Sequence, residues 1–191
     1  MDRNELMRLT REQMPERRWT HTVGVMETAV VLAERFGGDT EKADLAALLH
    51  DYCKFWPMER QIRTAVESGI AGDMLDYDPQ LLHAPLGAWI AEHELGVGDT
   101  AVLAAIRYHT SGRIGMTQLD KIICLADYME PGRDFPGVDL IRKLAETSLE
   151  QALVAGFDST ILFLLQKGKK VYPLTLLARN HLLDELKASR G

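Results

Sequence analysis

The segment Leu48-Leu49-His50-Asp51-Tyr52-Cys53-Lys54 places a histidine and an aspartate directly behind an apolar helix face. Residues 43–49 carry apolar side chains at helical spacing, and Asp39 offers a side-chain cap for the start of that helix. Burying a polar group without a partner costs about 2–7 kcal/mol, and burying an unpaired charge costs more, so His50 and Asp51 require a partner where the core begins. A bound cation is one candidate for that partner.

Helical periodicity also dominates the rest of the chain, and no segment shows the period-two alternation of a strand. Glycine and proline residues mark most of the expected helix ends. We therefore predict an all-α protein, a bundle of about eight to ten helices without a substantial sheet. The expected helices run through 23–33 as far as Gly37, through 40–50, 58–68, 83–94, 100–109, 118–130, 137–155 and 158–165, and from Pro173 onward.

Length, charge and cysteine content narrow the class of protein. A chain of 191 residues suits a single domain, and a net charge of −6 argues against a nucleic-acid partner, which would need a broad positive surface. Cys53 and Cys124 have neither metal-site nor disulfide spacing, which indicates a reducing compartment. The apolar runs are too short for a membrane span, and the charged N-terminus does not resemble a signal peptide. We expect a cytoplasmic protein without a membrane partner.

Histidine and aspartate residues at helix positions form the strongest chemical signal. His21, His50, His83 and His109 lie at marked points of the expected helices, and Asp127 interrupts the apolar run that precedes it. Any one of these residues alone is more often a structural group, but the whole set favours a metal site built from facing helices. Imidazole and carboxylate ligands suit Fe, Mn, Co or Zn. No dinucleotide-binding, P-loop, zincin or serine-hydrolase motif indicates a different chemistry.

The residues of this set resemble a known signature. His21, His50-Asp51 and Asp127 resemble the H…HD…D pattern of the HD-domain metal-dependent phosphohydrolase superfamily. Further segments, spread over nearly the whole chain, resemble the YqeK family of bacterial HD-domain hydrolases of diadenosine tetraphosphate. These segments are His50-Asp51-Tyr52-Cys53-Lys54, His83-Ala84-Pro85-Leu86-Gly87-Ala88, Tyr108-His109-Thr110-Ser111-Gly112, Ala126-Asp127-Tyr128-Met129-Glu130-Pro131-Gly132-Arg133 and Tyr172-Pro173-Leu174-Thr175.

The resemblance implies an enzyme that cleaves diadenosine tetraphosphate symmetrically into two ADP, by attack of a metal-activated water on a bridging phosphate. The implied cofactor is iron, as one or two ions, with Mn, Co or Zn as substitutes. His83 and His109 either complete a second metal site or bind phosphate, and the sequence leaves this choice open. The implied metal ligands are His21, His50, Asp51 and Asp127.

The resemblance also implies catalytic and substrate-binding residues. Asp51, Lys54 and Arg133 are the expected catalytic residues, because a lysine one helical turn beyond Asp51 and an arginine in the loop after Asp127 suit phosphate contacts. The chain is interpreted as one HD-type domain, residues 1–191. Its metal-binding core spans about 16–135, and a C-terminal helical extension over about 137–191 contributes to the nucleotide site. The expected substrate-binding residues are His21, Lys54, His83, His109, Thr110, Arg133, Lys170, Tyr172 and Pro173.

Two alternatives stay open at this point. One is another HD-domain phosphohydrolase or phosphodiesterase, acting on guanosine tetraphosphate, a nucleoside monophosphate or a cyclic nucleotide. The other is a nucleotide sensor without catalytic activity. The expected partner in the leading interpretation is a dinucleoside polyphosphate or ADP, and an exposed apolar helix face would allow a homodimer.

Overall fold

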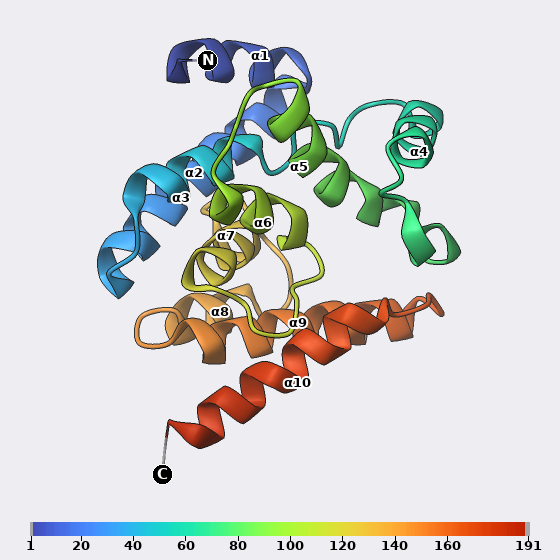
Figure 1. Cartoon of the computed structure of the whole chain (residues 1–191). Coiled ribbons are helices and arrows are strands. Elements are labelled where there is room, and N and C mark those ends of the chain that lie inside the picture. The colour runs from blue at the N-terminus through green and yellow to red at the C-terminus, as the bar shows by residue number, and fades with distance from the viewer. Residues whose placement is uncertain (1, 190–191) are drawn as a thin grey trace.

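The computed structural model describes residues 2–189, and within this range the chain forms ten α-helices, two short 3-10 helices and no strand (Figure 1). The prediction of an all-α bundle is therefore confirmed. Within the same range, no helix has both the length and the apolar character that crossing a bilayer requires. The α-helices are α1 (Arg3–Glu12), α2 (Glu16–Phe36), α3 (Thr40–Leu49), α4 (Met58–Glu67), α5 (His83–His93), α6 (Thr100–Tyr108), α7 (Gln118–Met129), α8 (Val138–Leu144), α9 (Leu149–Gln166) and α10 (Pro173–Ala188), and the 3-10 helices η1 (Gly72–Asp76) and η2 (Pro79–Leu82) lie between α4 and α5.

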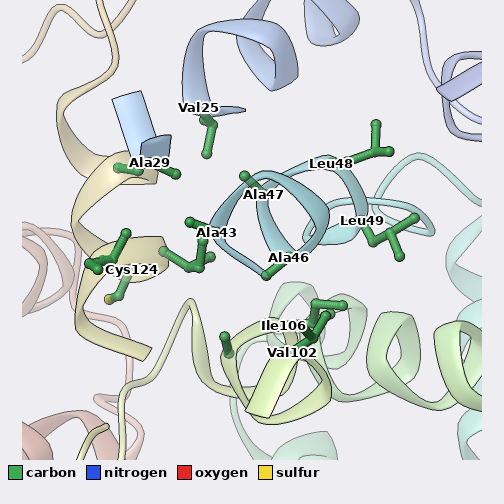
Figure 2. Close-up of a cluster of buried hydrophobic side chains, with 14 of the residues drawn as sticks. Val25, Ala29, Ala43, Ala46, Ala47, Leu48, Leu49, Val102, Ile106 and Cys124 are labelled. Carbon is green, nitrogen blue, oxygen red and sulfur yellow. The ribbon is translucent and has the colours of Figure 1, made fainter. Parts of the chain in front are cut away.

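Helix α3 lies in the middle of the apolar core. Its residues Ala43, Ala46 and Ala47 are fully buried, and their small side chains let neighbouring helices approach closely. Figure 2 shows side chains of α2, α6 and α7 around this helix on different sides. Packing on several faces therefore fixes the position of His50 and Asp51, which follow the last turn of α3.

Several candidate site residues lie at helix ends. Helix α3 ends directly before His50 and Asp51, and α6 ends directly before His109. His83 is the first residue of α5, and Asp127 lies in the last turn of α7. The first N–H groups and the last carbonyl groups of a helix have no hydrogen-bond partner within the helix. Side chains at these positions can therefore bind those backbone groups or face a ligand.

Side-chain caps begin several helices at the residues that the sequence indicates. Thr117 and Asp120 form a capping box at α7, in which each side chain accepts a hydrogen bond from the backbone N–H of the other residue. Asp39 caps α3 and Asp99 caps α6, each with a carboxylate that accepts from the backbone N–H groups two and three residues later. Pro173 is the first residue of α10, as expected.

The apolar periodicity predicts one helix over 137–155 and another over 158–165. The boundaries of both predicted helices are wrong. The chain breaks instead before Ser148, whose hydroxyl caps α9, and α9 continues through Asp158 without interruption. The carboxylate of Asp158 pairs with Arg179 of α10, with an N–O distance of 2.7 Å, and does not cap a new helix. Helix α1 was not expected either.

Helices α9 and α10 pack against each other, and α9 also contacts α7 and α8, so these last helices form the lower part of Figure 1. Lys121 of α7 adds a charged link. Its Nζ atom lies 2.8 Å from Oε1 of Glu150 in α9 and 2.6 Å from Oε2 of Glu185 in α10. The C-terminal segment is thus held to the core by apolar packing and by ion pairs.

Candidate metal centre

Asp51 is a fully buried carboxylate that lies among three imidazole rings. Its Oδ2 atom lies 3.2 Å from Nε2 of His50, and its Oδ1 atom lies 3.0 Å from Nε2 of His83 and 3.7 Å from Nε2 of His109. The Nε2 atoms of His83 and His109 are 3.1 Å apart. Side chains from the ends of α3, α5 and α6 therefore meet at one carboxylate.

Asp127 joins this group from α7. Its Oδ1 atom lies 3.0 Å from Nε2 of His21 in α2 and 3.9 Å from Nε2 of His50. The Nε2 atom of His21 also lies 3.9 Å from Oδ2 of Asp51. The fold thus brings together every histidine and aspartate that the sequence assigned to metal or phosphate. We call this group the His/Asp centre, and its members are His21, His50, Asp51, His83, His109 and Asp127.

Backbone hydrogen bonds set the tautomer of three of these imidazoles. The Nδ1 atoms of His50, His83 and His109 lie 2.6, 2.5 and 2.8 Å from the carbonyl oxygen of the residue three positions earlier. A carbonyl oxygen can only accept, so each Nδ1 carries the hydrogen and donates it. In the neutral ring, each Nε2 then carries a lone pair, and these lone pairs are directed into the His/Asp centre.

Burial keeps the same three imidazoles uncharged. It lowers the pKa of His109 to about 4 and lowers the pKa values of His50 and His83 well below 6.5. A protonated imidazole cannot bind a metal, whereas a neutral one can. These rings are therefore in the ligand form at neutral pH.

The unsatisfied atoms of the centre indicate a cation. The Nε2 atoms of His21 and His50 and both carboxylate oxygens of Asp51 are buried without a hydrogen-bond partner in the described part of the chain. Within that part, two triplets of ligand atoms lie close enough to hold an ion, one from His21, His50 and Asp127 and one from His50, Asp51 and His109. Imidazole nitrogens and carboxylate oxygens suit first-row metals such as Fe, Mn, Co and Zn. The residues present therefore fit a metal.

Glu130 orients His21 from outside the centre. Its Oε1 atom accepts a hydrogen bond from Nδ1 of His21 at 3.0 Å, and its Oε2 atom accepts from the backbone N–H of Gly132 at 2.6 Å. The side chain is buried, and a Cβ atom at Gly24 would lie only 2.7 Å from Oε2. A carboxylate behind a ligand imidazole commonly fixes its tautomer and its orientation.

Three cationic side chains surround the two aspartates. Arg18 contacts Oδ2 of Asp51 through Nη2, which lies 4.0 Å from Oδ1 of Asp127. Lys54 places Nζ 3.3 Å from Oδ1 of Asp51, although α3 does not continue as far as Lys54. Arg133 contacts the Asp127 carboxylate through Nη2 and donates from Nε to its backbone carbonyl at 2.7 Å. Lys54 and Arg133 thus lie at the two aspartates, and their catalytic roles stay predictions.

The charged forms of these groups persist at neutral pH. Burial lowers the pKa of Arg18 to about 10 and the pKa of Lys54 to about 8, so both remain largely protonated at pH 7. Burial alone would raise the pKa of Asp127. The close contact with His21 and the charge of Arg133 outweigh burial and hold that pKa well below its ordinary value. The centre therefore contains carboxylates and cations side by side.

The sequence analysis missed Arg18 and Glu130 as site residues. Arg18 precedes His21 by three positions in α2, so both side chains lie on one face of that helix. Glu130 follows Asp127 by three positions, at the end of α7. This three-residue spacing from an expected ligand is the signal that could have identified them.

Two hollows adjoin the residues of the centre. A cleft of about 920 Å³ is lined by Arg18, His21, Phe55 and Arg133, among others. A smaller cavity of about 220 Å³ is lined by residues adjacent in sequence to the ligand histidines, together with part of the C-terminal segment. Pro85, Tyr108, Thr110 and Tyr172 are among the residues that line this cavity.

The expected substrate-binding residues of the C-terminal segment are not all at the centre. Thr110 and Tyr172 line the 220 Å³ cavity together. Lys170 instead donates from Nζ to the backbone carbonyl of Asp76 at 2.9 Å, and it does not line that cavity. Pro173 is exposed at the start of α10. The substrate-binding roles of Lys170 and Pro173 therefore stay predictions without a contact to the His/Asp centre.

The sequence matches one protein family and is similar to several known proteins along almost its whole length. The family described as "HD domain" matches residues 18–132, a stretch that contains all members of the His/Asp centre. The "Bis(5'-nucleosyl)-tetraphosphatase, symmetrical" of Bacillus subtilis (strain 168) is 50% identical over 184 residues, which cover 96% of this chain and 99% of that protein. The protein of the same name from Staphylococcus aureus (strain NCTC 8325 / PS 47) is 43% identical, with 95% of this chain and 94% of that protein covered.

A solved structure extends the likeness to the fold. The crystal structure of a "predicted HD superfamily hydrolase involved in NAD metabolism" from Clostridium acetobutylicum superposes with a TM-score of 0.92 at 40% sequence identity. The superposition covers 97% of this chain and 98% of that one. The helical arrangement described above is therefore shared along almost the entire length.

Proposed function

Because the chain belongs to the HD-domain family, and within it to the family of the symmetrical bis(5'-nucleosyl)-tetraphosphatases, we propose that it hydrolyses diadenosine tetraphosphate into two ADP. The observation that carries the proposal is the convergence of neutral imidazoles and carboxylates from five helical regions on one buried point. Packing alone does not require these polar side chains, because apolar side chains would fill the space at a lower cost in free energy.

We propose that His21, His50, Asp51 and Asp127 hold the metal, and that it is iron, with Mn, Co or Zn as substitutes. A divalent ion in such a site would acidify a water molecule and neutralise phosphate charge. His83 and His109 lie near enough to Oδ1 of Asp51 to help hold a second ion. Alternatively, their Nε2 atoms would contact a phosphate group, either a protonated phosphate directly or any phosphate through a bridging water molecule. Both roles remain in the proposal. All of these proposed ligands are members of the His/Asp centre.

The cations of the site would bind the polyphosphate. Arg18, Lys54 and Arg133 are cationic side chains that pair with Asp51 or Asp127. Guanidinium groups bind phosphate oxygens in a bidentate manner, and hydrogen bonds between charged groups are about twice as strong as neutral ones. We propose that these side chains divide their contacts between the aspartates and the phosphates when substrate enters.

Symmetrical cleavage adds one water molecule across the central P–O–P bridge. A new P–O bond forms to the water oxygen, the bridging P–O bond breaks, and the bridging oxygen leaves with the second ADP. The leaving ADP gains negative charge, which a cation at the centre stabilises. The ammonium group of Lys54 lies beside Asp51 and would stabilise this charge.

Part of the C-terminal extension would contribute to the nucleotide site. Tyr172 lines the 220 Å³ cavity with Thr110, so the segment before α10 helps to form a hollow next to His109. Lys170 and Pro173 are retained as substrate-binding candidates. Lys170 would have to give up its hydrogen bond to the carbonyl of Asp76 to reach a phosphate.

The deciding experiment is to incubate metal-loaded protein with diadenosine tetraphosphate and to separate the nucleotides by chromatography. ADP as the only product supports the proposal. AMP together with ATP would contradict symmetrical cleavage and move the attack to another phosphorus atom. Turnover only in a panel of guanosine tetraphosphate, nucleoside monophosphates and cyclic nucleotides would favour another HD-domain reaction. Bound metal and nucleotide without turnover of any substrate would favour a sensor.

We also propose a cytoplasmic location and a homodimer. Cys53 and Cys124 are buried free thiols, which suits a reducing compartment. Leu162, Phe163 and Leu165 of α9 are more than half exposed, at 56%, 53% and 62%, and would suit a surface between two copies of the chain. Light scattering at micromolar concentration would test the dimer, and a monomeric mass would contradict it.

A further inference from the structure

Phe55 is an exposed aromatic residue next to the His/Asp centre. It lies between Lys54, whose ammonium group faces Asp51, and Trp56, which is only 8% exposed. Phe55 itself is 48% exposed. Packing of the core therefore does not explain a large aromatic side chain at this position.

The cleft that Phe55 lines leads to the centre. Its lining includes His21, Arg18 and Arg133, which contact the carboxylates of Asp51 or Asp127. The lining also includes Phe55 and Pro131, which offer apolar surface. The cleft thus combines cations, which suit phosphate groups, with an aromatic ring, on which a base can stack.

The smaller cavity is lined by sequence neighbours of two other members of the His/Asp centre. Thr110 follows His109 directly in sequence, and Pro85 follows His83 by two positions. His83 and His109 lie at Oδ1 of Asp51, whereas Arg18 contacts Oδ2. The cleft and the cavity therefore adjoin groups that bind different oxygens of one aspartate.

We infer that the cleft is the site of the second nucleoside of the substrate, with the ring of Phe55 as the surface on which its base stacks. This inference rests on the proposed function. A dinucleoside tetraphosphate carries one nucleoside at each end, so phosphates that react at the centre require a place for a nucleoside on both sides. The cavity with Tyr108 and Tyr172 serves one base, and the cleft with Phe55 serves the other.

Stacking on an aromatic side chain gives the size of the expected effect. Replacing an aromatic residue under a base by alanine weakens binding by roughly five- to 150-fold in nucleic-acid binding proteins. Because Phe55 is half exposed, we expect about tenfold. The loss should affect ligands with two nucleosides and leave a ligand with one nucleoside almost unchanged.

The test measures the affinity of metal-loaded protein for two ligands by calorimetry. One ligand is diadenosine tetraphosphate with a methylene group in the central bridge, which resists hydrolysis, and the other is ADP. The variants are Phe55→Ala, Phe55→Trp and, as a control, Leu140→Ala, which removes a side chain that is 55% exposed on α8.

We expect Phe55→Ala to weaken the two-nucleoside analogue about tenfold, to change the affinity for ADP by less than twofold, and to be rescued in Phe55→Trp. Equal losses for both ligands, or no loss for either, would overturn the inference. Hydrolysis by the unaltered protein is measured in parallel. A selective loss of analogue binding without any turnover would leave the second nucleoside site intact and reject the proposed function alone.

Discussion

The Oε1 atom of Glu130 lies 3.0 Å from Nδ1 of His21, while Nε2 of the same ring lies 3.0 Å from Oδ1 of Asp127. The imidazole is thus held between one carboxylate outside the centre and one inside it. The outer carboxylate fixes which nitrogen faces the metal position, so the geometry of His21 depends on a residue outside the His/Asp centre.

Replacing Glu130 by glutamine should weaken metal binding. The amide retains the shape of the side chain but loses the charge that makes Nε2 of His21 a better donor, so we expect a 10- to 100-fold fall in affinity. Competition with a chelator at pH 7 measures it. Glu67→Gln, at an exposed position of α4, is the control. Equal affinity in both variants would show that Glu130 has no such role.

Replacing Gly24 by alanine should separate metal affinity from stability. The new Cβ atom would lie 2.7 Å from Oε2 of Glu130, so the carboxylate must shift away from His21. Alanine within a helix is favoured over glycine by about 1 kcal/mol, which limits any loss of stability. We expect weaker metal binding at a nearly unchanged melting temperature. Gly98→Ala, where no atom lies within 4 Å of the added Cβ, is the control.

Replacing Asp51 by asparagine should remove both metal and activity. Asp51 lies beside three imidazoles and contacts two cations of the site, and asparagine loses the negative charge that would bind a metal ion. We expect a fall in hydrolysis of at least about 100-fold and loss of stoichiometric metal in elemental analysis. Full activity in a metal-free Asp51→Asn protein would reject the proposed metal dependence.

Replacing Arg18 by methionine should impair substrate binding but spare the metal. Its guanidinium group contacts Asp51 in the protein without substrate, so removing this cation leaves the carboxylate at least as attractive to a metal ion. A hydrogen bond to a charged group contributes about 1.5–3 kcal/mol, which corresponds to a rise in KM of roughly 10- to 100-fold. Arg63→Met, at an exposed position of α4, is the control. Loss of metal from Arg18→Met would contradict this role.

Replacing Lys121 by methionine should lower stability at neutral pH and much less at acidic pH. Partial burial opposes both charges, but the hydrogen bonds between Lys121 and Glu150 outweigh it, so the pKa of Lys121 is raised and the pKa of Glu150 is lowered. The pair is therefore fully stabilising between the unfolded-state values, about pH 4.5 and 10.5. Its contribution disappears as the pH falls through the lowered pKa of Glu150 or rises through the raised pKa of Lys121.

We expect Lys121→Met to reduce the free energy of unfolding by about 1 kcal/mol at pH 7, measured by urea denaturation. At pH 3 the difference from the unaltered protein should become small. Lys187→Met, at a side chain that is 77% exposed, is the control and should have little effect at either pH. A difference that stays constant or grows toward pH 3 would contradict the role of the Lys121 ion pairs.

Residues close in sequence predicted most of the local structure correctly. Asp39, Asp99 and the pair Thr117 and Asp120 mark the starts of α3, α6 and α7, because a cap depends on atoms within one helical turn. The break before Ser148 was missed, since apolar periodicity continues across it. There the cap and the packing of α8 and α9 decided the outcome over the periodic pattern.

The amino-acid sequence alone determined the helical class and the types of ligand, because apolar spacing and residue chemistry are properties of the chain itself. Only the tertiary structure brought His21, His83 and Asp127 to Asp51, since contacts between distant segments depend on how helices pack. Packing likewise placed Glu130 behind His21 and directed lone pairs toward a shared point. The sequence identified the candidate ligands, and the fold determined the distances between them.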